Sequence, residues 1–228
     1  MRVAALFSGG KDSTYAARLA EMQSHEVAFL VSMEPARPDS WMFHSVNIRL
    51  APLLAEAMGK RHVSAATRGE KEVELDDLAA ALGGLGVEGV VSGAVASTYQ
   101  RERVDAICRR FSLAHVAPLW GRRQDEVLAE EAAAGMEIII TAVAARGLDS
   151  GWLGRTLDEE AIGELVDLGR KYGLNVCGEG GEYESLVLDA PWFRSRLEII
   201  EAFKEWDDSS GVYRVKRARL VPKLHKKG

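Results

Sequence analysis

The sequence predicts an α/β fold, in which a doubly wound parallel sheet is followed by a second, smaller α/β domain. Short apolar, β-branched segments alternate with longer segments of helical periodicity through most of the chain, a pattern typical of β-α-β units. After about Leu148 this alternation ends, and one more helix and three β-like runs follow. A length of 228 residues allows a main domain with a smaller companion. We therefore expect domains at residues 1–120 and 121–228.

The part of the chain with regular alternation contains the candidate strands of the parallel sheet. They are expected at residues 3–7, 27–32, 61–64, 90–93, 115–117 and 137–141. Helices are expected at residues 12–22, about 45–58, 73–82, 98–111 and 124–134, where alanine, leucine and glutamate recur at helical spacing. Pro52 lies inside the second of these helices and predicts a kink or a late start.

The remainder of the chain predicts a helix and a hairpin. Asp158 is expected to cap a helix that stops at Gly173. Three β-like runs follow at residues 185–188, 197–203 and 212–220. The last two flank a good turn sequence at 207–211, so they are expected to pair as an antiparallel hairpin.

The composition is that of an ordinary globular protein and excludes several classes. The formal net charge of −5 argues against nucleic acid as a partner. The two cysteines, Cys108 and Cys177, are far apart in sequence, which excludes a disulfide framework and a four-thiolate zinc site and suits a reducing, cytoplasmic location. Every apolar stretch falls short of the roughly 18 residues that a membrane-spanning helix needs, so no membrane association is expected.

The segment Ser8-Gly9-Gly10-Lys11-Asp12-Ser13 lies between the first predicted strand and the first predicted helix. Glycines let backbone N–H groups approach a ligand closely, and the helix N-terminus adds a positive dipole. The segment therefore predicts a phosphate site. It is not a Walker A loop, because Ala5 stands where that motif needs its first glycine and Asp12 stands where it needs a hydroxyl.

This segment resembles the pyrophosphate loop of the N-type ATP pyrophosphatases, which cleave ATP to AMP and pyrophosphate. A second resemblance covers nearly the whole chain. The segments that carry it are 93–97 with Tyr99, Gln100, Arg101 and Arg103, then 117–120, 147–149, 153–155 and 178–184. They look like the diphthine–ammonia ligase family.

The resemblance implies the HUP-like, adenine nucleotide alpha hydrolase-like form of the fold and an AMP-forming amide ligase. Its substrates would be ATP with Mg²⁺, ammonium, and translation elongation factor 2 carrying diphthine, whose carboxylate is amidated through an acyl-adenylate. A homo-oligomer is compatible with these features.

Candidate site residues follow from the loop and from the resemblance. Lys11 and Asp12 are the expected catalytic residues: Lys11 would stabilise the charge on departing pyrophosphate, and Asp12 would cap the helix or hold Mg²⁺. Adenine is expected near the end of the second strand, because ligands of open parallel sheets lie beyond the carboxyl ends of the strands. The expected nucleotide-binding residues are Ser8, Gly9, Gly10, Lys11, Asp12, Ser13, Ser32, Met33, His44 and Gly93.

Acceptor binding is expected from two further segments. The expected substrate-binding residues are Ser97, Gln100, Arg103, Glu179, Gly181, Glu182, Tyr183 and Glu184. Arg103 would clamp a phosphate or carboxylate, although a solvated arginine explains it equally well. The glutamates with Tyr183 would attract the trimethylammonium group of the implied substrate. Binding of Mg²⁺ or ammonium, or a plain exposed acidic turn, are the alternatives for this segment.

Two other functions stay open at the level of sequence. One keeps the ATP chemistry but replaces the acceptor with a small metabolite or a tRNA base, the latter disfavoured by the acidic charge. The other is a module that senses ATP without turning it over.

Overall fold

The computed structural model describes residues 1–35, 46–67 and 73–223. Its first part is a parallel sheet of five strands in the order β3-β2-β1-β4-β5. The strands are β1 (Arg2–Leu6), β2 (Glu26–Pro35), β3 (Arg61–Thr67), β4 (Gly89–Val91) and β5 (Ala114–Val116). The strand order reverses at β1, so the carboxyl ends of β1 and β4 flank a crevice of the kind in which such sheets bind ligands.

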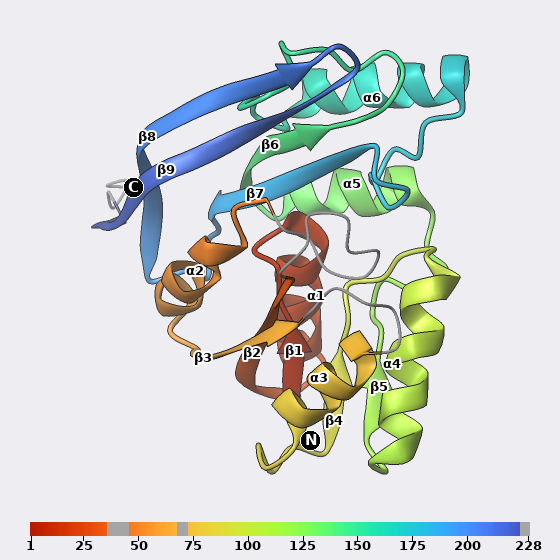
Figure 1. Cartoon of the computed structure of the whole chain (residues 1–228), viewed down its shortest axis with the longest axis vertical. Coiled ribbons are helices and arrows are strands. Elements are labelled where there is room, and N and C mark those ends of the chain that lie inside the picture. Colours follow the sequence, from red (N-terminus) through yellow and green to blue (C-terminus); the bar gives the residue numbers. More distant parts are fainter. Residues whose placement is uncertain (36–45, 68–72, 224–228) are drawn as a thin grey trace.

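Helices cover both faces of this sheet, which is the doubly wound arrangement that the sequence predicts (Figure 1). The helices of this part are α1 (Lys11–Met22), η1 (Ile48–Leu50), α2 (Ala51–Met58), α3 (Val73–Leu82) and α4 (Thr98–Arg110). Val3 and Ala5 of β1 pack in one core with α1 and α2, whereas Ala4 packs in a second core with α3 and α4. Successive strand residues point to opposite faces, so one strand supplies both cores.

The second part is an antiparallel sheet in the order β7-β6-β9-β8, with two helices against it (Figure 1). Its elements are α5 (Gln124–Ala133), β6 (Glu137–Val143), α6 (Glu159–Tyr172), β7 (Tyr183–Asp189), β8 (Ser195–Asp207) and β9 (Ser210–Pro222). The predicted hairpin is confirmed: β8 and β9 pair from Ser195 to Asp207 across a turn at 208–209. Asp158 caps α6 by accepting a hydrogen bond from the Ala161 amide, and Gly173 ends it with φ +74°.

The expectation that residues 137–141 form a sixth parallel strand is wrong. β6 lies in the other sheet and runs antiparallel to both β7 and β9. Its isoleucine run is buried on both faces, which is the pattern of a central strand in either kind of sheet. Apolar periodicity reports burial but does not report which strand is the neighbour or in which direction it runs.

Of the two expectations for Pro52, a kink or a late helix start, the late start is confirmed. The stretch predicted as one helix contains a short 3₁₀ turn, and α2 begins at Ala51 with Pro52 in its first turn. Proline is tolerated there because its missing N–H has no intrahelical partner at that position.

The two parts share one apolar core. Phe7, Leu54, Ile138 and Leu197 belong to the same buried cluster, and Arg194 N donates to Ala57 O across the two parts, 2.6 Å away. A boundary at residue 120 therefore stays a prediction, since Leu119 is itself buried in this shared core. Every helix among the described residues is too short or too polar to cross a membrane.

Candidate functional site

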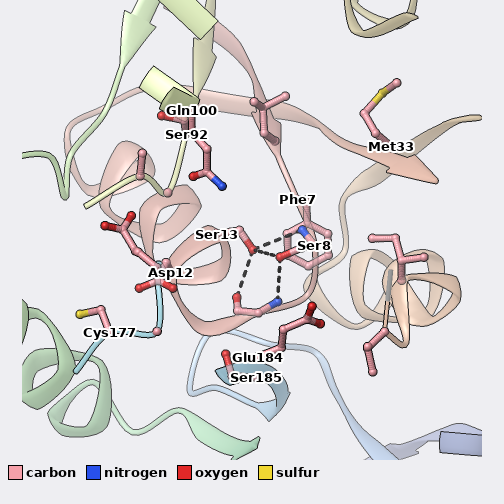
Figure 2. A pocket seen from close by; sticks show the side chains of 18 of the residues that line it. Phe7, Ser8, Asp12, Ser13, Met33, Ser92, Gln100, Cys177, Glu184 and Ser185 are labelled. Atoms are coloured by element: carbon pink, nitrogen blue, oxygen red, sulfur yellow. Dashed lines mark hydrogen bonds between the residues drawn. The ribbon is translucent and has the colours of Figure 1, made fainter. Parts of the chain in front are cut away.

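A cavity of about 150 Å³ lies at the carboxyl ends of β1, β2 and β4, where α1 and α4 begin (Figure 2). The antiparallel part closes its other side with the segment 177–185. Among the residues predicted from sequence, those that line the cavity are Ser8, Gly10, Asp12, Ser13, Met33, Gly93, Gln100, Glu179, Tyr183 and Glu184. Residues far apart in sequence thus meet at the crevice where a parallel sheet binds ligands.

Hydroxyl groups hold the loop after β1 in shape. Ser13 Oγ accepts from Ser8 N at 3.3 Å, lies 3.2 Å from Ser8 Oγ and donates to Gly10 O at 3.1 Å, and Gly10 N donates to Ser8 Oγ at 3.3 Å (Figure 2). Gly9 has φ +81°, and a Cβ there would lie 2.6 Å from Leu54 Cδ1. The hydroxyl groups of Ser8 and Ser13 therefore bond within the loop and hold its shape without a ligand.

Helix α1 begins at this loop, and its N-cap is Gly10 without a side-chain cap. The expectation that Asp12 caps the helix is wrong, because Asp12 already lies within the first turn, one residue past the first helical position. The first amides of a helix have no intrahelical acceptor and carry a partial positive charge. Lys11 N donates to Ser185 Oγ at 3.2 Å. The loop and the helix start together have the features of an anion site.

Gly93, at the end of β4, lies against the start of α1. A Cβ at this position would be 2.8 Å from the Asp12 carbonyl carbon and 2.8 Å from Ser13 N. Only glycine allows this close approach of two backbones. The predicted residue Gly93 is therefore needed to set the width of the crevice.

The Lys11 side chain points away from the cavity, into the protein. Its exposed fraction is 1%, and Nζ lies 2.7 Å from Asp12 Oδ1 and 3.4 Å from Glu131 Oε2 of α5. The Tyr183 ring centroid is 5.9 Å from Nζ. Burial alone lowers the pKa of Lys11, but the carboxylates of Asp12 and Glu131 outweigh it and hold the pKa well above its ordinary value. Burial also raises the pKa of Glu131 above its ordinary value, and the Lys11 ammonium opposes that rise. Lys11 is thus a buried cation between the carboxyl groups of Asp12 and Glu131.

The end of β2 supplies apolar wall. Val31 and Met33 line the cavity, at the place predicted for adenine. Ser32 lies between them and points to the other face of the sheet, where its buried hydroxyl donates to Phe7 O at 2.6 Å and lies 2.9 Å from His62 Nε2. The Ser32 side chain is therefore outside the cavity, as strand alternation requires. His44 lies outside the described residues.

Helix α4 turns one side toward the cavity. Gln100 and Val104, one turn apart, line it, whereas Ser97 is the N-cap of the helix and accepts from Gln100 N at 3.4 Å. Arg103 stacks on the Tyr99 ring, with Cζ 3.5 Å from the ring centroid. Of the predicted residues on this helix, the structure brings only Gln100 to the cavity wall.

The glutamates of the 178–184 segment have different surroundings. Glu179 accepts hydrogen bonds from Val95 N at 2.6 Å and from Ala96 N, and its pKa is raised by burial, which these amides only partly oppose. Glu182 accepts from Asn175 N at 3.2 Å and Gly180 N at 2.8 Å and so shapes its own segment. Glu184 lines both the cavity and a neighbouring hollow of about 660 Å³.

Gly181 and Tyr183 complete this segment. Gly181 has φ +85° and lines the hollow. The Tyr183 hydroxyl donates to Val176 O at 2.7 Å, and its ring faces Lys11; burial raises the pKa of Tyr183. Tyr183 therefore contacts a cation of the protein itself, although its edge reaches the cavity.

The residues that sequence reasoning missed include three with polar side chains. Ser185 holds the amide of Lys11. Glu131 lies on an ordinary-looking helix and carried no motif. Ser92 lines the cavity with its hydroxyl 2.8 Å from His115 Nε2, whose Nδ1 lies 2.6 Å from an Asp105 carboxylate oxygen. For Ser185, its place directly after the glycine-rich segment was the one available signal.

The side chains at the cavity fit a Mg²⁺ ion that is bound together with a nucleotide, rather than one enclosed by protein ligands alone. Among the described residues there is no cluster of three or more histidine, cysteine or acidic side chains that would enclose a metal ion. Mg²⁺ bound with a nucleotide usually takes one or two carboxylates, together with phosphate oxygens and water. Asp12, whose carboxylate lines the cavity beside the anion site, meets that requirement.

A glycine-rich loop that leads into a helix N-terminus at the carboxyl edge of a doubly wound parallel sheet is typical of α/β proteins that bind phosphorylated ligands at this edge. Within that class, residues 1–115 match the diphthamide synthase N-terminal domain and residues 124–221 match the diphthamide synthase C-terminal domain. The chain belongs to the diphthamide synthase family. This confirms the resemblance carried by the sequence motifs.

Relatives named diphthine–ammonia ligase occur in several organisms. The human protein is 38% identical over 222 residues, covering 87% of this chain and 83% of the human protein. The zebrafish protein is 36% identical over 224 residues, covering 89% and 87%. The fission yeast protein is 34% identical over 221 residues, which cover 88% of this chain and 36% of the longer yeast protein.

One solved structure, described as a predicted subunit of tRNA methyltransferase from Methanocaldococcus jannaschii, aligns with a TM-score of 0.48. It is 16% identical, and the alignment covers 84% of this chain and 98% of that chain.

Proposed function

We propose that this protein is an ATP-dependent, AMP-forming ligase that amidates the carboxylate of diphthine on translation elongation factor 2, with ammonia as nitrogen donor. The observation that carries the proposal is the meeting, in one cavity, of an anion-binding loop and the 177–185 segment, in a chain 38% identical to a human protein named diphthine–ammonia ligase. A cytoplasmic location is part of the proposal.

The reaction has two steps. The acceptor carboxylate attacks the α-phosphorus of ATP, which forms an acyl-adenylate and releases pyrophosphate. Ammonia then attacks the acyl carbon, AMP departs, and the nitrogen loses a proton to become the amide. A carboxylate alone reacts poorly with ammonia, and the adenylate supplies the leaving group that the second step needs.

The loop residues would serve the first step. The N–H groups of Ser8, Gly10 and Lys11 already donate to serine hydroxyls. The remaining amides of the preformed loop and of the first turn of α1 would hold the phosphates, and they need no reorganisation as charge develops on the departing pyrophosphate. Asp12 would hold Mg²⁺, which supplies positive charge to the triphosphate. Val31 and Met33 offer an apolar surface for the adenine ring.

The antiparallel part would serve the acceptor. Glu184 lines both the nucleotide cavity and the neighbouring hollow, so its carboxylate would attract the cationic trimethylammonium group of diphthine or an ammonium ion at the junction of the two. Glu179 would keep the β4–α4 connection in place through the amides of Val95 and Ala96. Tyr183 is a poor candidate for the cation, because its ring faces Lys11.

The test is a turnover assay with ATP, Mg²⁺ and ammonium, with and without elongation factor 2 carrying diphthine. We expect AMP and pyrophosphate in equal amounts, together with conversion of the carboxylate to an amide on the factor, detected by mass spectrometry. Asp12→Asn should abolish AMP formation, whereas Asp125→Asn, on the exposed start of α5, should not. ATP binding without turnover on this factor would contradict the proposal that diphthine is the acceptor. The search would then turn to small carboxylates or to an ATP-sensing role.

A further inference from the structure

We propose that Lys11 acts through Asp12 rather than on the phosphates, and that Glu131 of α5 is a positioning residue that holds the Lys11 ammonium in place. The inference rests on the proposed function only in taking MgATP as the ligand of the cavity. It adds a residue from the C-terminal half of the chain to a loop that the sequence places entirely in the N-terminal half.

Lys11 is directed away from the ligand. Its Nζ is buried between Asp12 Oδ1 at 2.7 Å and Glu131 Oε2 at 3.4 Å, and Lys11 is absent from the cavity wall that its neighbours Gly10 and Asp12 line. Consecutive residues at a helix start point in different directions, and here Asp12 lines the cavity while the Lys11 side chain enters the interior. To reach a phosphate, the Lys11 ammonium would have to leave both carboxylates.

Glu131 has no other strong partner in the described structure. It is fully buried, and neither carboxylate oxygen has a hydrogen-bond donor within bonding geometry. A buried charge without compensation costs several kcal/mol. The Lys11 ammonium is the only cation for which an ion pair with Glu131 is formed among these residues, so the pair fixes the position of Nζ from the side opposite Asp12.

In the series of contacts from Glu131 through Lys11 to Asp12, Asp12 is the residue that reaches the cavity. One of its oxygens accepts the hydrogen bond from Lys11 Nζ, its side chain is 26% exposed, and it lines the cavity. The ammonium therefore fixes the orientation of the carboxylate before nucleotide arrives. Removing a partner that orients a ligating carboxylate in this way typically lowers metal affinity or activity by about 10- to 100-fold.

The experiment is a double-mutant cycle on the full chain, read out as the dissociation constant of MgATP by calorimetry without acceptor. Glu131→Gln keeps the side-chain shape but removes the charge, and we expect it to weaken MgATP binding by about 10-fold or more. If Glu131 acts through Asp12, the Glu131→Gln/Asp12→Asn double variant binds no more than about twofold more weakly than Asp12→Asn alone. Glu126→Gln, on the exposed side of the same helix and paired with Arg123, is the control and should bind as the wild type does.

Each outcome bears on the proposal. Unchanged binding by Glu131→Gln, or losses that multiply in the double variant, would overturn it and return Lys11 to the phosphates. If Glu131→Gln fails to unfold cooperatively, Lys11→Met/Glu131→Met leaves neither charge stranded. Wild-type affinity in that folded variant overturns the proposal, and so does a further loss when the same two changes are added to Asp12→Asn; affinity equal to that of Asp12→Asn alone in the triple variant supports it. A wild-type protein that binds no MgATP refutes the proposed function as well, whereas a failure of amidation alone leaves this cycle unaffected.

Discussion

At the scale of single residues, some side chains of the loop after β1 hold its structure and others are left to bind a ligand. Ser8 and Ser13 bond to each other and to the loop backbone, and Lys11 points into the protein. Asp12 and the amides that donate to no serine hydroxyl therefore remain to bind a ligand. Simple removal of Lys11 is therefore an ambiguous probe. Lys11→Ala would strand the buried Glu131 carboxylate, and breaking one side of a buried pair costs about 3–5 kcal/mol.

Gly93 gives a cleaner probe of the crevice. Gly93→Ala would place a methyl group 2.8 Å from backbone atoms of Asp12 and Ser13, and backbone cannot move aside as a side-chain end can. We expect the first turn of α1 to shift and MgATP binding to weaken by at least about tenfold, since a displacement near 1 Å at a reacting site costs on the order of 100-fold.

The matched control is Gly163→Ala in α6, where an added Cβ meets nothing within 4 Å. Alanine is the better helix former by about 1 kcal/mol, so this variant should raise the melting temperature and leave binding unchanged. Normal MgATP binding by a folded Gly93→Ala protein would contradict the role assigned to this close approach.

The two cysteines give a second prediction. Burial raises the pKa of Cys177 to about 12 and that of Cys108 to about 11. The reactive form is the thiolate, so at pH 8 neither thiol should react with a disulfide reagent in the native protein. After unfolding in guanidinium both should react. Rapid labelling of native Cys177, which borders the cavity, would show that the site opens far more than the structure indicates.

At the scale of elements, Asn47 adds a specific polar contact between the two parts to the apolar core that they share. This buried residue precedes η1, donates from Nδ2 to Tyr213 O at 2.9 Å and accepts at Oδ1 from Val215 N at 2.9 Å. Its φ is +60°, a conformation that asparagine tolerates better than most residues. One side chain thus ties the segment entering α2 to strand β9.

Asn47→Ala should lower stability through both features. The loss strands a backbone N–H and a carbonyl, at about 1–3 kcal/mol for each buried unsatisfied group, and adds left-handed strain of about 1 kcal/mol. For a chain of this size each kcal/mol shifts the melting temperature by about 2–4 °C. Asn47→Gly removes the bonds without the strain and should melt between the wild type and Asn47→Ala. Equal melting of Asn47→Ala and the wild type would refute this account.

At the scale of the whole molecule, the cavity exists only where the two parts meet. Residues of β1, β2, α1 and α4, with residues 92–94 after β4, form one side, and the 177–185 segment forms the other. The principal core runs continuously from Val3 and Leu54 in the parallel part to Ile138 and Leu197 in the antiparallel part. The two parts matched by separate family domains therefore fold around shared apolar surface.

A fragment of residues 1–120 should consequently not fold by itself. It would expose the apolar side of α1 and α2 and would leave Lys11 without Glu131. We expect no cooperative thermal transition by circular dichroism and strong binding of a hydrophobic dye, in contrast to the full chain. Cooperative melting and retained MgATP binding by the fragment would show that the parallel part is an independent domain.

The amino-acid sequence is enough to predict the alternation of elements, the first five strands, the β8–β9 hairpin, the caps of α6 and the glycine-rich loop before α1. These features depend on local information: periodicity, turn residues, caps and glycines at positions of positive φ. The motif segments also identified the family, because they retain the residue types around the site in order along the chain.

The packing of the elements is needed to tell which side chains face the cavity and which strands are neighbours. β6 reads the same in a parallel or an antiparallel sheet, since its isoleucines report burial and not direction. Ser32 and Lys11 belong to the right segments but point away from the cavity, and Glu131 is 120 residues from Lys11 in a helix without a motif. Side-chain direction and long-range pairing arise when separate elements pack together, and no local pattern in the chain records that packing.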